Sequence, residues 1–290
     1  MPDAEKHIVL CPNPERDIGL QMTLKAREML IKAGHRVVVS PVYAQESEGA
    51  LATMQDTLPL EEAAKNASLL VCFGGDGTIL KTARAVVKNP VPILGVNLGH
   101  KGFMAELERD ELELILPAAN GQHTPVNRVM LDVELRREGE VVYSDVALNE
   151  AVVCGTATTI QLSAYGDGCK IMEYTGDGII VATATGSTAY SLAAGGALAE
   201  PTAKNIMLTP ICAHVITVRP MILAPDRVVT IKTGENKGKN IWLSIDGGEL
   251  IPFLKNDELN VKLSQYHTIM AHVSGKSFYD IAFKKLGERI

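Results

Sequence analysis

The sequence predicts an α/β N-terminal domain with a largely parallel sheet, plus a β-rich C-terminal domain. Two observations carry this prediction. Up to about residue 120, short apolar runs alternate with segments that have apolar residues at helical spacing, which is typical of βαβ units. Beyond Asn120-Gly121, helical spacing thins out, and short alternating runs follow one another, separated by Gly, Asp and Asn.

The N-terminal elements follow from these patterns in chain order. Strands are predicted at 7–11, 36–40, 69–73 and 91–96, and helices at 20–33, 79–87 and 106–116. The last of these helices is strongly acidic and ends at Pro117. Because strands and helices alternate, the sheet is expected to be doubly wound and largely parallel.

The second half of the chain predicts an antiparallel sheet domain. Its strands are expected at 131–135, 141–146, 151–153, 159–162, 179–182, 228–231 and 241–245. The predicted domains are therefore 1–126 and 127–276, with the boundary near Val126. The tail at about 277–290 has an ambiguous propensity and is expected to pack back on the first domain.

Composition excludes several classes of protein. With 290 residues, 46% of them hydrophobic and 21% charged, the chain can bury a sizeable core. A net charge of −6 and a pI near 5.7 argue against a nucleic-acid partner. No signal peptide or membrane span is evident, so the expected location is cytoplasmic. The five cysteines are scattered, which fits reduced thiols better than disulfides or a zinc site.

A glycine-rich turn at residues 73–78 predicts a phosphate site with one carboxylate in it. Gly74, Gly75 and Gly77 lack a Cβ, so backbone N–H groups can approach a polyanion, and the helix that starts near Thr78 adds a favourable dipole. Asp76 would repel phosphate, which indicates a proton acceptor for an attacking hydroxyl or a ligand for a phosphate-bound metal ion. The alternative is a βα turn in which Asp76 only caps the helix.

A second cluster covers residues 174–196 and is rich in glycine and hydroxyl side chains. Asp177 lies between two glycines before the strand at 179–182, and small residues continue up to Tyr190. Such backbone suits hydrogen-bonded contact with a ribose, a base edge or a phosphate, with Tyr190 available for stacking. A polar turn before a helix starting near Ala189 explains the local pattern equally well.

Taken in order, six segments resemble the NAD kinase family in its bacterial form. The segments are 74–78 (GGDGT), 95–103 (GVNLGHKGF), 148–150 (LNE), 176–196, 208–212 with the following Arg219-Pro220, and 244–247 (SIDG). GGDG turns also occur in diacylglycerol and sphingosine kinases and, in a related form, in phosphofructokinases. The block 177–196 and the pair Asn149-Glu150 distinguish NAD kinases from those relatives.

The resemblance implies a phosphotransferase with an alcohol acceptor. It would transfer the terminal phosphate of ATP, or of polyphosphate, to the 2′-hydroxyl of the adenosine ribose of NAD and so make NADP. Mg²⁺ or another divalent cation would shield the phosphate charge, although the residues that bind it are not identified. A homodimer or homotetramer is implied, with small-molecule substrates and neither nucleic acid nor membrane as partners.

The resemblance also implies roles for the two predicted domains and for single residues. Domain 1–126 would hold the phosphate donor and the catalytic loop, and domain 127–276 would bind NAD. Asp76 would act on the 2′-hydroxyl, while Asn149 and Glu150 would fix hydroxyls of NAD, since an amide both donates and accepts and a carboxylate accepts from a vicinal diol. Asp177 would contact the nicotinamide end. The remaining predicted NAD-binding residues are Gly77, Asn97, Phe103, Thr188, Ala189, Tyr190 and Ser191, of which the last four would line the adenine side. For Phe103, a stacking wall and core packing remain equally open.

Departures from the family pattern and rival functions limit this transfer. Ala193 replaces a common serine, Thr175 a frequent basic residue and Gly248 a frequent glutamine, and Lys101 occupies a position that is often apolar. A lipid or sugar kinase and a non-catalytic NAD/NADP sensor are the alternatives. No GxGxxG follows the first strand, which counts against a dehydrogenase. Residues 234–240 imitate a P-loop but are one residue short, and a basic hairpin tip is expected there.

Overall fold

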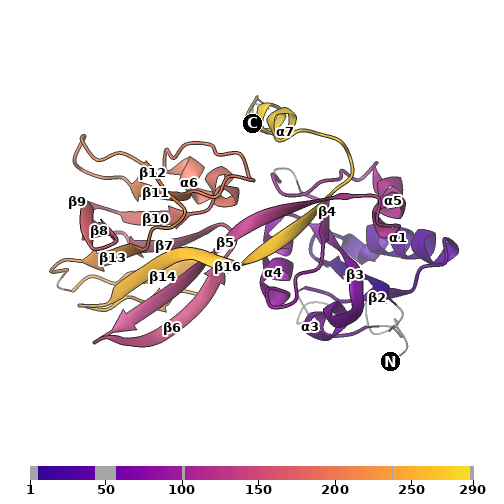
Figure 1. Cartoon of the computed structure of the whole chain (residues 1–290), viewed down its shortest axis with the longest axis horizontal. Coiled ribbons are helices and arrows are strands. Elements are labelled where there is room, and N and C mark those ends of the chain that lie inside the picture. Colours follow the sequence, from indigo (N-terminus) through magenta and orange to yellow (C-terminus); the bar gives the residue numbers. More distant parts are fainter. Residues whose placement is uncertain (1–5, 43–56, 100–101, 237, 288–290) are drawn as a thin grey trace. The chain divides into compact units, whose positions relative to one another are not determined.

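The computed structural model describes residues 6–42, 57–99, 102–236 and 238–287, and the departure at Lys101 lies outside them. The chain forms two compact units (Figure 1). Unit 1 comprises Met1–Asn127 with Thr268–Ile290, and unit 2 comprises Arg128–His267. The chain passes from unit 1 to unit 2 after Asn127 and back after His267, whereas the sequence predicted boundaries near Val126 and at about residue 277. Two strands, β5 (Thr124–Arg137) and β16 (Glu258–His272), cross the boundaries.

Unit 1 contains a parallel sheet with the strand order β2-β1-β3-β4, and β16 pairs with β4 through Met270. The strands are β1 (His7–Pro12), β2 (Val37–Val39), β3 (Ala67–Gly74) and β4 (Ile93–Asn97). The helices are α1 (Gln21–Lys32), α3 (Leu60–Ala63), α4 (Asp76–Ala85), α5 (Ile115–Ala119) and α7 (Phe278–Gly287), with 3-10 turns η1 (Ile18–Leu20), η3 (Ala64–Asn66) and η4 (Leu112–Leu114).

Helices cover both faces of this sheet, as Figure 1 shows. Leu10 and its neighbours pack with Leu30 of α1 and Ile115 of α5, whereas Cys72 contacts Thr82 of α4 on the other face. Burial on both sides explains why the strands are continuous apolar runs. Since the strand order reverses between β1 and β3, their carboxyl ends form the topological switch point, where α/β sheets bind ligands. The glycine-rich turn at the end of β3 lies there.

The predicted helix at 106–116 is wrong for most of its length. Residues 106–111 are irregular, and the helical segment starts with η4 and continues in α5 beyond Pro117. The carboxylates of this acidic segment bind distant parts of unit 1. Glu106 accepts N–H groups of Val273 and Ser274, and Glu111 pairs with Lys276.

Unit 2 is β-rich and antiparallel, which together with unit 1 confirms the predicted fold class. One sheet has the order β12-β11-β10-β7-β14-β15, and a second array has the order β16-β13-β8-β9, with β5 pairing β16 and β6. The bounds are β6 (Glu140–Ala147), β7 (Glu150–Gly155), β8 (Ile160–Gly166), β9 (Cys169–Gly176), β10 (Gly178–Ala182), β11 (Ile206–Ile211), β12 (Met221–Leu223), β13 (Val229–Thr233), β14 (Ile241–Ile245) and β15 (Ile251–Pro252), with η5 (Thr185–Thr188) and α6 (Tyr190–Ala193). Side chains of both arrays share one apolar core.

Two further expectations need correction. Residues 234–240 are not a hairpin tip, because β13 and β14 belong to different sheets and do not pair. The sequence patterns also miss five strands, β9, β11, β12, β15 and β16. None of the described helices is long and apolar enough to cross a membrane.

Candidate active site

The turn between β3 and α4 forms a candidate phosphate site in unit 1. Gly74 ends the strand, Gly75 precedes the helix, and Asp76 is its first residue. A Cβ on Gly74 would lie 2.2 Å from Thr78 Oγ1, so this close turn requires glycine. No side chain caps α4, and its Thr78 and Ile79 N–H groups donate to Gly75 O, so an anion would be met by the N–H groups that precede Thr78.

Asp76 does not cap its own helix, contrary to the simpler alternative. Its Oδ2 accepts the N–H of Phe103 at 2.9 Å and its Oδ1 that of Met104 at 3.1 Å, which fixes the carboxylate against the loop after β4. Burial raises the pKa of Asp76, opposed by these N–H bonds and by the charge of Lys285. A carboxylate with a raised pKa is a better proton acceptor than an ordinary aspartate.

Asn97 and Phe103 are brought close to Asp76 by the same loop. A Cβ on Gly102 would meet Asp76 Oδ1 at 3.0 Å and Asn97 Oδ1 at 3.5 Å. Asn97 is buried, donates to Glu108 Oε2 at 3.0 Å and accepts the Gly99 N–H at 3.0 Å, so its amide shapes the loop. Phe103 is half-buried, a position that fits either a wall or packing.

Asn149 and Glu150, at the start of β7, form the core of the candidate site in unit 2. Both side chains are buried, and Asn149 Oδ1 and Glu150 Oε2 have no hydrogen-bond partner among the described residues. Thr185 Oγ1 is a third buried atom of this kind. Leaving a buried polar atom unpaired costs about 1–3 kcal/mol, so three such atoms in one unit indicate a place for a polar ligand.

Asp246 supports this pair from the turn after β14. Its carboxylate accepts the backbone N–H groups of Leu148 and Asn149, both at 2.8 Å, and of Glu150 at 3.0 Å. Burial, and then the negative charge of Asp246, raise the pKa of Glu150 to about 8.

Asp177 and Tyr190 line one pocket of about 810 Å³ within unit 2. Both side chains are exposed, and Ala193 and Cys212 lie on the same wall. The pocket is large enough for a nucleotide-sized ligand. Its lining includes Ala193, so the missing serine hydroxyl leaves that stretch of wall apolar.

The other predicted residues of the 185–191 segment are less available. Thr188 donates its hydroxyl to Thr185 O at 3.2 Å, and the Ala189 side chain is half-buried. Ser191 is fully buried, and its Oγ lies 2.9 Å from Thr209 Oγ1. The Ser191 hydroxyl is therefore part of the packing between α6 and β11.

The residues missed from the sequence are Asp246, Thr185 and Lys285. Asp246 lies in the quoted SIDG segment, which was the only available signal, and its contacts lie almost a hundred positions away in the chain. Lys285 Nζ lies 3.4 Å from Glu108 Oε1, and its side chain is 9% exposed. Among the residues described, no group of three or more His, Cys, Asp or Glu side chains is arranged to hold a metal ion.

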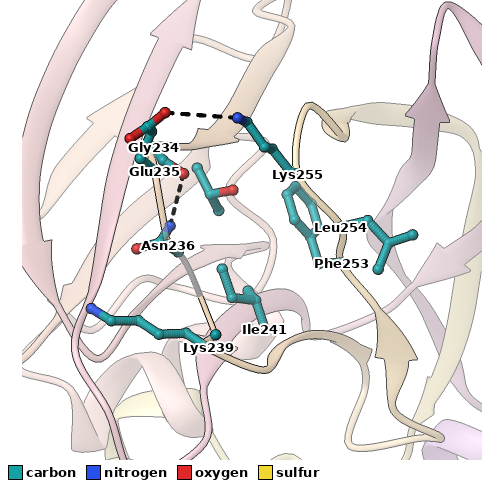
Figure 2. A pocket seen from close by; sticks show the side chains of 10 residues that line it. Gly234, Glu235, Asn236, Lys239, Ile241, Phe253, Leu254 and Lys255 are labelled. Carbon is teal, nitrogen blue, oxygen red and sulfur yellow. Dashed lines mark hydrogen bonds and ion pairs between the residues drawn. The ribbon is translucent and has the colours of Figure 1, made fainter.

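The P-loop imitation at 234–240 lines a different cavity, of about 260 Å³ (Figure 2). Ile241, Phe253 and Leu254 form its apolar side, and Glu235 reaches toward Lys255, with Oε1 and Nζ 3.7 Å apart. Lys239 instead donates to the backbone oxygen of Thr159. The loop connects two sheets and has no helix after it, so it lacks the elements of a phosphate loop.

An uncapped helix that begins at a glycine turn, with one carboxylate held beside it, is the arrangement expected of a phosphotransferase with an alcohol acceptor. Models of the ATP-NAD kinase N-terminal domain and of the ATP-NAD kinase C-terminal domain match residues 8–123 and 129–273. The chain belongs to the ATP-NAD kinase family.

Full-length relatives agree with this assignment. The chain is 33% identical over 287 residues to an NAD kinase of Ruminiclostridium cellulolyticum, covering 98% of this chain and 99% of the relative. It is 32% identical to an NAD kinase of Acetivibrio thermocellus over 285 residues, 97% of each chain.

Solved structures share the fold. A yeast NADH kinase complexed with NADH superposes with a TM-score of 0.85 at 23% identity, covering 99% of this chain and 88% of the other. An NAD kinase from Archaeoglobus fulgidus in complex with ATP gives a TM-score of 0.73 at 22% identity, covering 97% and 98% of the two chains.

Proposed function

We propose that this NAD kinase transfers the terminal phosphate of ATP to the 2′-hydroxyl of the adenosine ribose of NAD, with Asp76 as the proton acceptor. The observation that carries the proposal is the Asp76 carboxylate, held by two N–H groups at the start of an uncapped helix. The hydroxyl oxygen attacks the γ-phosphorus, the bond to the β-phosphate oxygen breaks, and ADP leaves. The hydroxyl proton passes to Asp76.

The remaining residues of unit 1 hold the donor. Backbone N–H groups at Gly75 and Gly77 and the dipole of α4 stabilise phosphate oxygens, and polyphosphate presents the same groups as ATP. The half-buried Asp76 is a hard oxygen donor of the kind Mg²⁺ accepts beside phosphates. A bound divalent cation would neutralise charge on the transferred phosphoryl group.

Residues of unit 2 recognise the acceptor. Asn149 and Glu150 present unpaired buried oxygen atoms that suit ribose hydroxyls, Asp177 binds the nicotinamide end, and Tyr190 stacks on adenine. Thr188, Ala189 and Ser191 line the adenine side through their backbone. We also propose a homodimer or homotetramer, with NAD and the phosphate donor as the small-molecule partners.

The test is Asp76→Asn, assayed with NAD, ATP and Mg²⁺ and an NADP-specific dehydrogenase. Loss of a positioned base should lower kcat by about 10²–10⁴, while NAD binding and folding persist. If Asp76 holds Mg²⁺ instead, raising Mg²⁺ should restore part of kcat, which loss of a base would not allow. Asp110→Asn, an exposed aspartate of the same unit, is the matched control.

The catalytic role fails if a folded, NAD-binding Asp76→Asn protein keeps kcat within about threefold of the parent. That change corresponds to under roughly 0.7 kcal/mol, too small for a base or a metal ligand. Replacing ATP by polyphosphate in the same assay shows which donor is used.

A further inference from the structure

Asp246 holds three consecutive N–H groups on one carboxylate. Its Oδ1 accepts from Asn149 and Glu150, and its Oδ2 accepts from Leu148, at 2.8 to 3.0 Å. In return, the Asp246 N–H donates to the Glu150 carbonyl at 3.0 Å. The backbone of the Asn149-Glu150 pair is thus shaped by a residue nearly a hundred positions later in the chain.

A second contact fixes the pair from the other side. Thr183 donates its hydroxyl to Leu148 O at 2.6 Å and its N–H to Asn149 O at 2.8 Å. A Cβ on Gly186 would lie 2.2 Å from Asn149 O, so the turn at 185–188 lies directly on this backbone. The backbone of the Asn149-Glu150 pair is therefore held from two sides.

The carboxyl of Glu150 is placed where ionisation is unfavourable. The residue is 6% exposed, Oε2 has no partner among the described residues, and no cation compensates it. Asp246 is the charged group that acts on it, and its sign is the same. The other polar side chains around the Asn149-Glu150 pair carry no charge. They are those of Asn149, of Thr183 and of Thr185 at the start of η5. A buried carboxyl group that also feels a charge of its own sign favours its protonated form, and Asp246 already accepts three N–H bonds, so the proton is expected on Glu150.

We propose that Asp246 is a positioning residue that folds the Asn149-Glu150 pair and keeps the Glu150 carboxyl protonated, so that Glu150 enters the dinucleotide site as a hydrogen-bond donor. This rests on the proposed function for the identity of the ligand. A protonated Glu150 donates to an acceptor atom of NAD, such as a ribose or phosphate oxygen, whereas an ionised one could only accept. The site then pairs one donor, from Glu150, with acceptors on Asn149 and Thr185.

The first experiment needs no ligand. The protein is labelled with ¹³C at the glutamate carboxyl carbons, and the Glu150 resonance is assigned by its absence in Glu150→Gln. We expect it to titrate with a midpoint near 8, and Asp246→Asn to lower the midpoint while burial still keeps it above the ordinary glutamate value. A Glu150 that titrates in the ordinary glutamate range, or a midpoint unmoved by Asp246→Asn, overturns the proposal.

Asp246→Asn suits this purpose because Asp246 has a left-handed φ of 49°, which asparagine tolerates as well as aspartate. Asparagine has one acceptor oxygen where aspartate has two. Its NH₂ group would therefore face one of the backbone N–H groups that Asp246 now accepts. If Asp246→Asn does not fold, the decision rests on the Glu150 titration in the parent protein and on the binding comparison below.

The second experiment measures NAD affinity by calorimetry from pH 6 to pH 9 for the parent, Glu150→Gln and Glu150→Ala. Glutamine keeps a donor at every pH, so Glu150→Gln should bind at least about tenfold more tightly than Glu150→Ala. The parent should lose affinity above pH 8, and Glu150→Gln should not. Tighter parent binding at high pH would show that Glu150 acts as an acceptor and would overturn the proposal.

These outcomes are separable from the proposed reaction. The carboxyl titration stands or falls without any substrate, and the calorimetry reads binding alone. Failure of the Asp76→Asn test would leave both results intact, and failure here would leave the assignment of Asp76 intact.

Discussion

Burial raises the pKa of both the Asp76 and the Glu150 carboxyl groups, but their different partners favour different protonation states. Asp76 accepts two N–H bonds and feels the positive charge of Lys285, which oppose the effect of burial on its pKa. Glu150 has no such compensation and faces a second carboxylate. The first can stay ionised and accept a proton, whereas the second retains one.

The pKa of Glu150 predicts a stability difference that depends on pH. Below about pH 4.5 the carboxyl is protonated in both folded and unfolded chains, so it costs nothing. As the pH rises toward 8, the unfolded chain ionises and the folded one resists, so stability is lost across this window. Glu150→Gln removes that loss. Its advantage over the parent in free energy of unfolding should therefore grow by roughly 3–5 kcal/mol from pH 5 to pH 8. Urea unfolding at both pH values measures the gain, and a pH-independent difference would contradict it.

Asp177 is exposed on the pocket wall, so its replacement tests binding without disturbing the core. Asp177→Ala should raise KM for NAD by about tenfold or more and leave kcat nearly unchanged, because its contact is made equally in ground and transition states. Asp226→Ala, another exposed aspartate of unit 2, serves as the control. Steady-state kinetics with varied NAD concentration measures both constants. An unchanged KM for NAD would show that Asp177 does not contact the dinucleotide.

At the scale of elements, the loop after β4 positions the carboxylate of Asp76, the proposed proton acceptor. A Cβ on Gly102 would press on Asp76 Oδ1 at 3.0 Å, a tighter contact than side chains normally make. Gly102→Ala should therefore lower kcat by about 10–100-fold with little change in melting temperature, since small displacements of a reacting group are costly. Gly99→Ala is the control, because its Cβ would meet Asn97 Oδ1 at an ordinary 3.7 Å. Equal kcat values for both variants would contradict this role of the loop.

The sequence pattern predicted the strands whose side chains are buried along all or most of their length. Continuous apolar runs identified β1, β3 and β4, because burial on both faces requires them. The segment 106–116 misled because its acidic residues bind groups that follow β16, partners that helical periodicity does not encode. Strand β16 was missed because its middle is polar and partly exposed, which hides the alternation at its two ends.

The candidate site was predictable to the same degree. Motif order pointed to Asp76, to the Asn149-Glu150 pair and to Asp177, each of which lies beside glycines or in a polar turn. The contacts of Asp246 could not be foreseen, because three N–H groups meet it only after β7 and β14 pair. Ser191 resembled a ligand contact in sequence, but its hydroxyl is taken by Thr209.

At the scale of the whole molecule, exposed apolar side chains beside a sheet edge predict association. Strand β12 is an edge strand, Ile222 on it is 58% exposed, and Ile216 in the preceding loop is 82% exposed. We expect a dimer or tetramer by light scattering at micromolar concentration, and a smaller species for Ile222→Lys. Ile18→Lys, at an exposed isoleucine of unit 1, should not change the mass. A fully active monomeric parent would contradict the proposed assembly.

Unit 1 is closed by a segment that follows unit 2 in the chain. Met270 pairs beside β4, and Lys276 and Lys285 join the acidic loop at Glu111 and Glu108. On a ribosome adding about 5–20 residues per second, translation of residues 128–267 takes roughly 7–28 s. During that interval the N-terminal sheet lacks its pairing partner β16, so the free edge of β4 is exposed. An exposed parallel edge is a target for chaperones, so newly made chains should depend on them until Met270 has emerged.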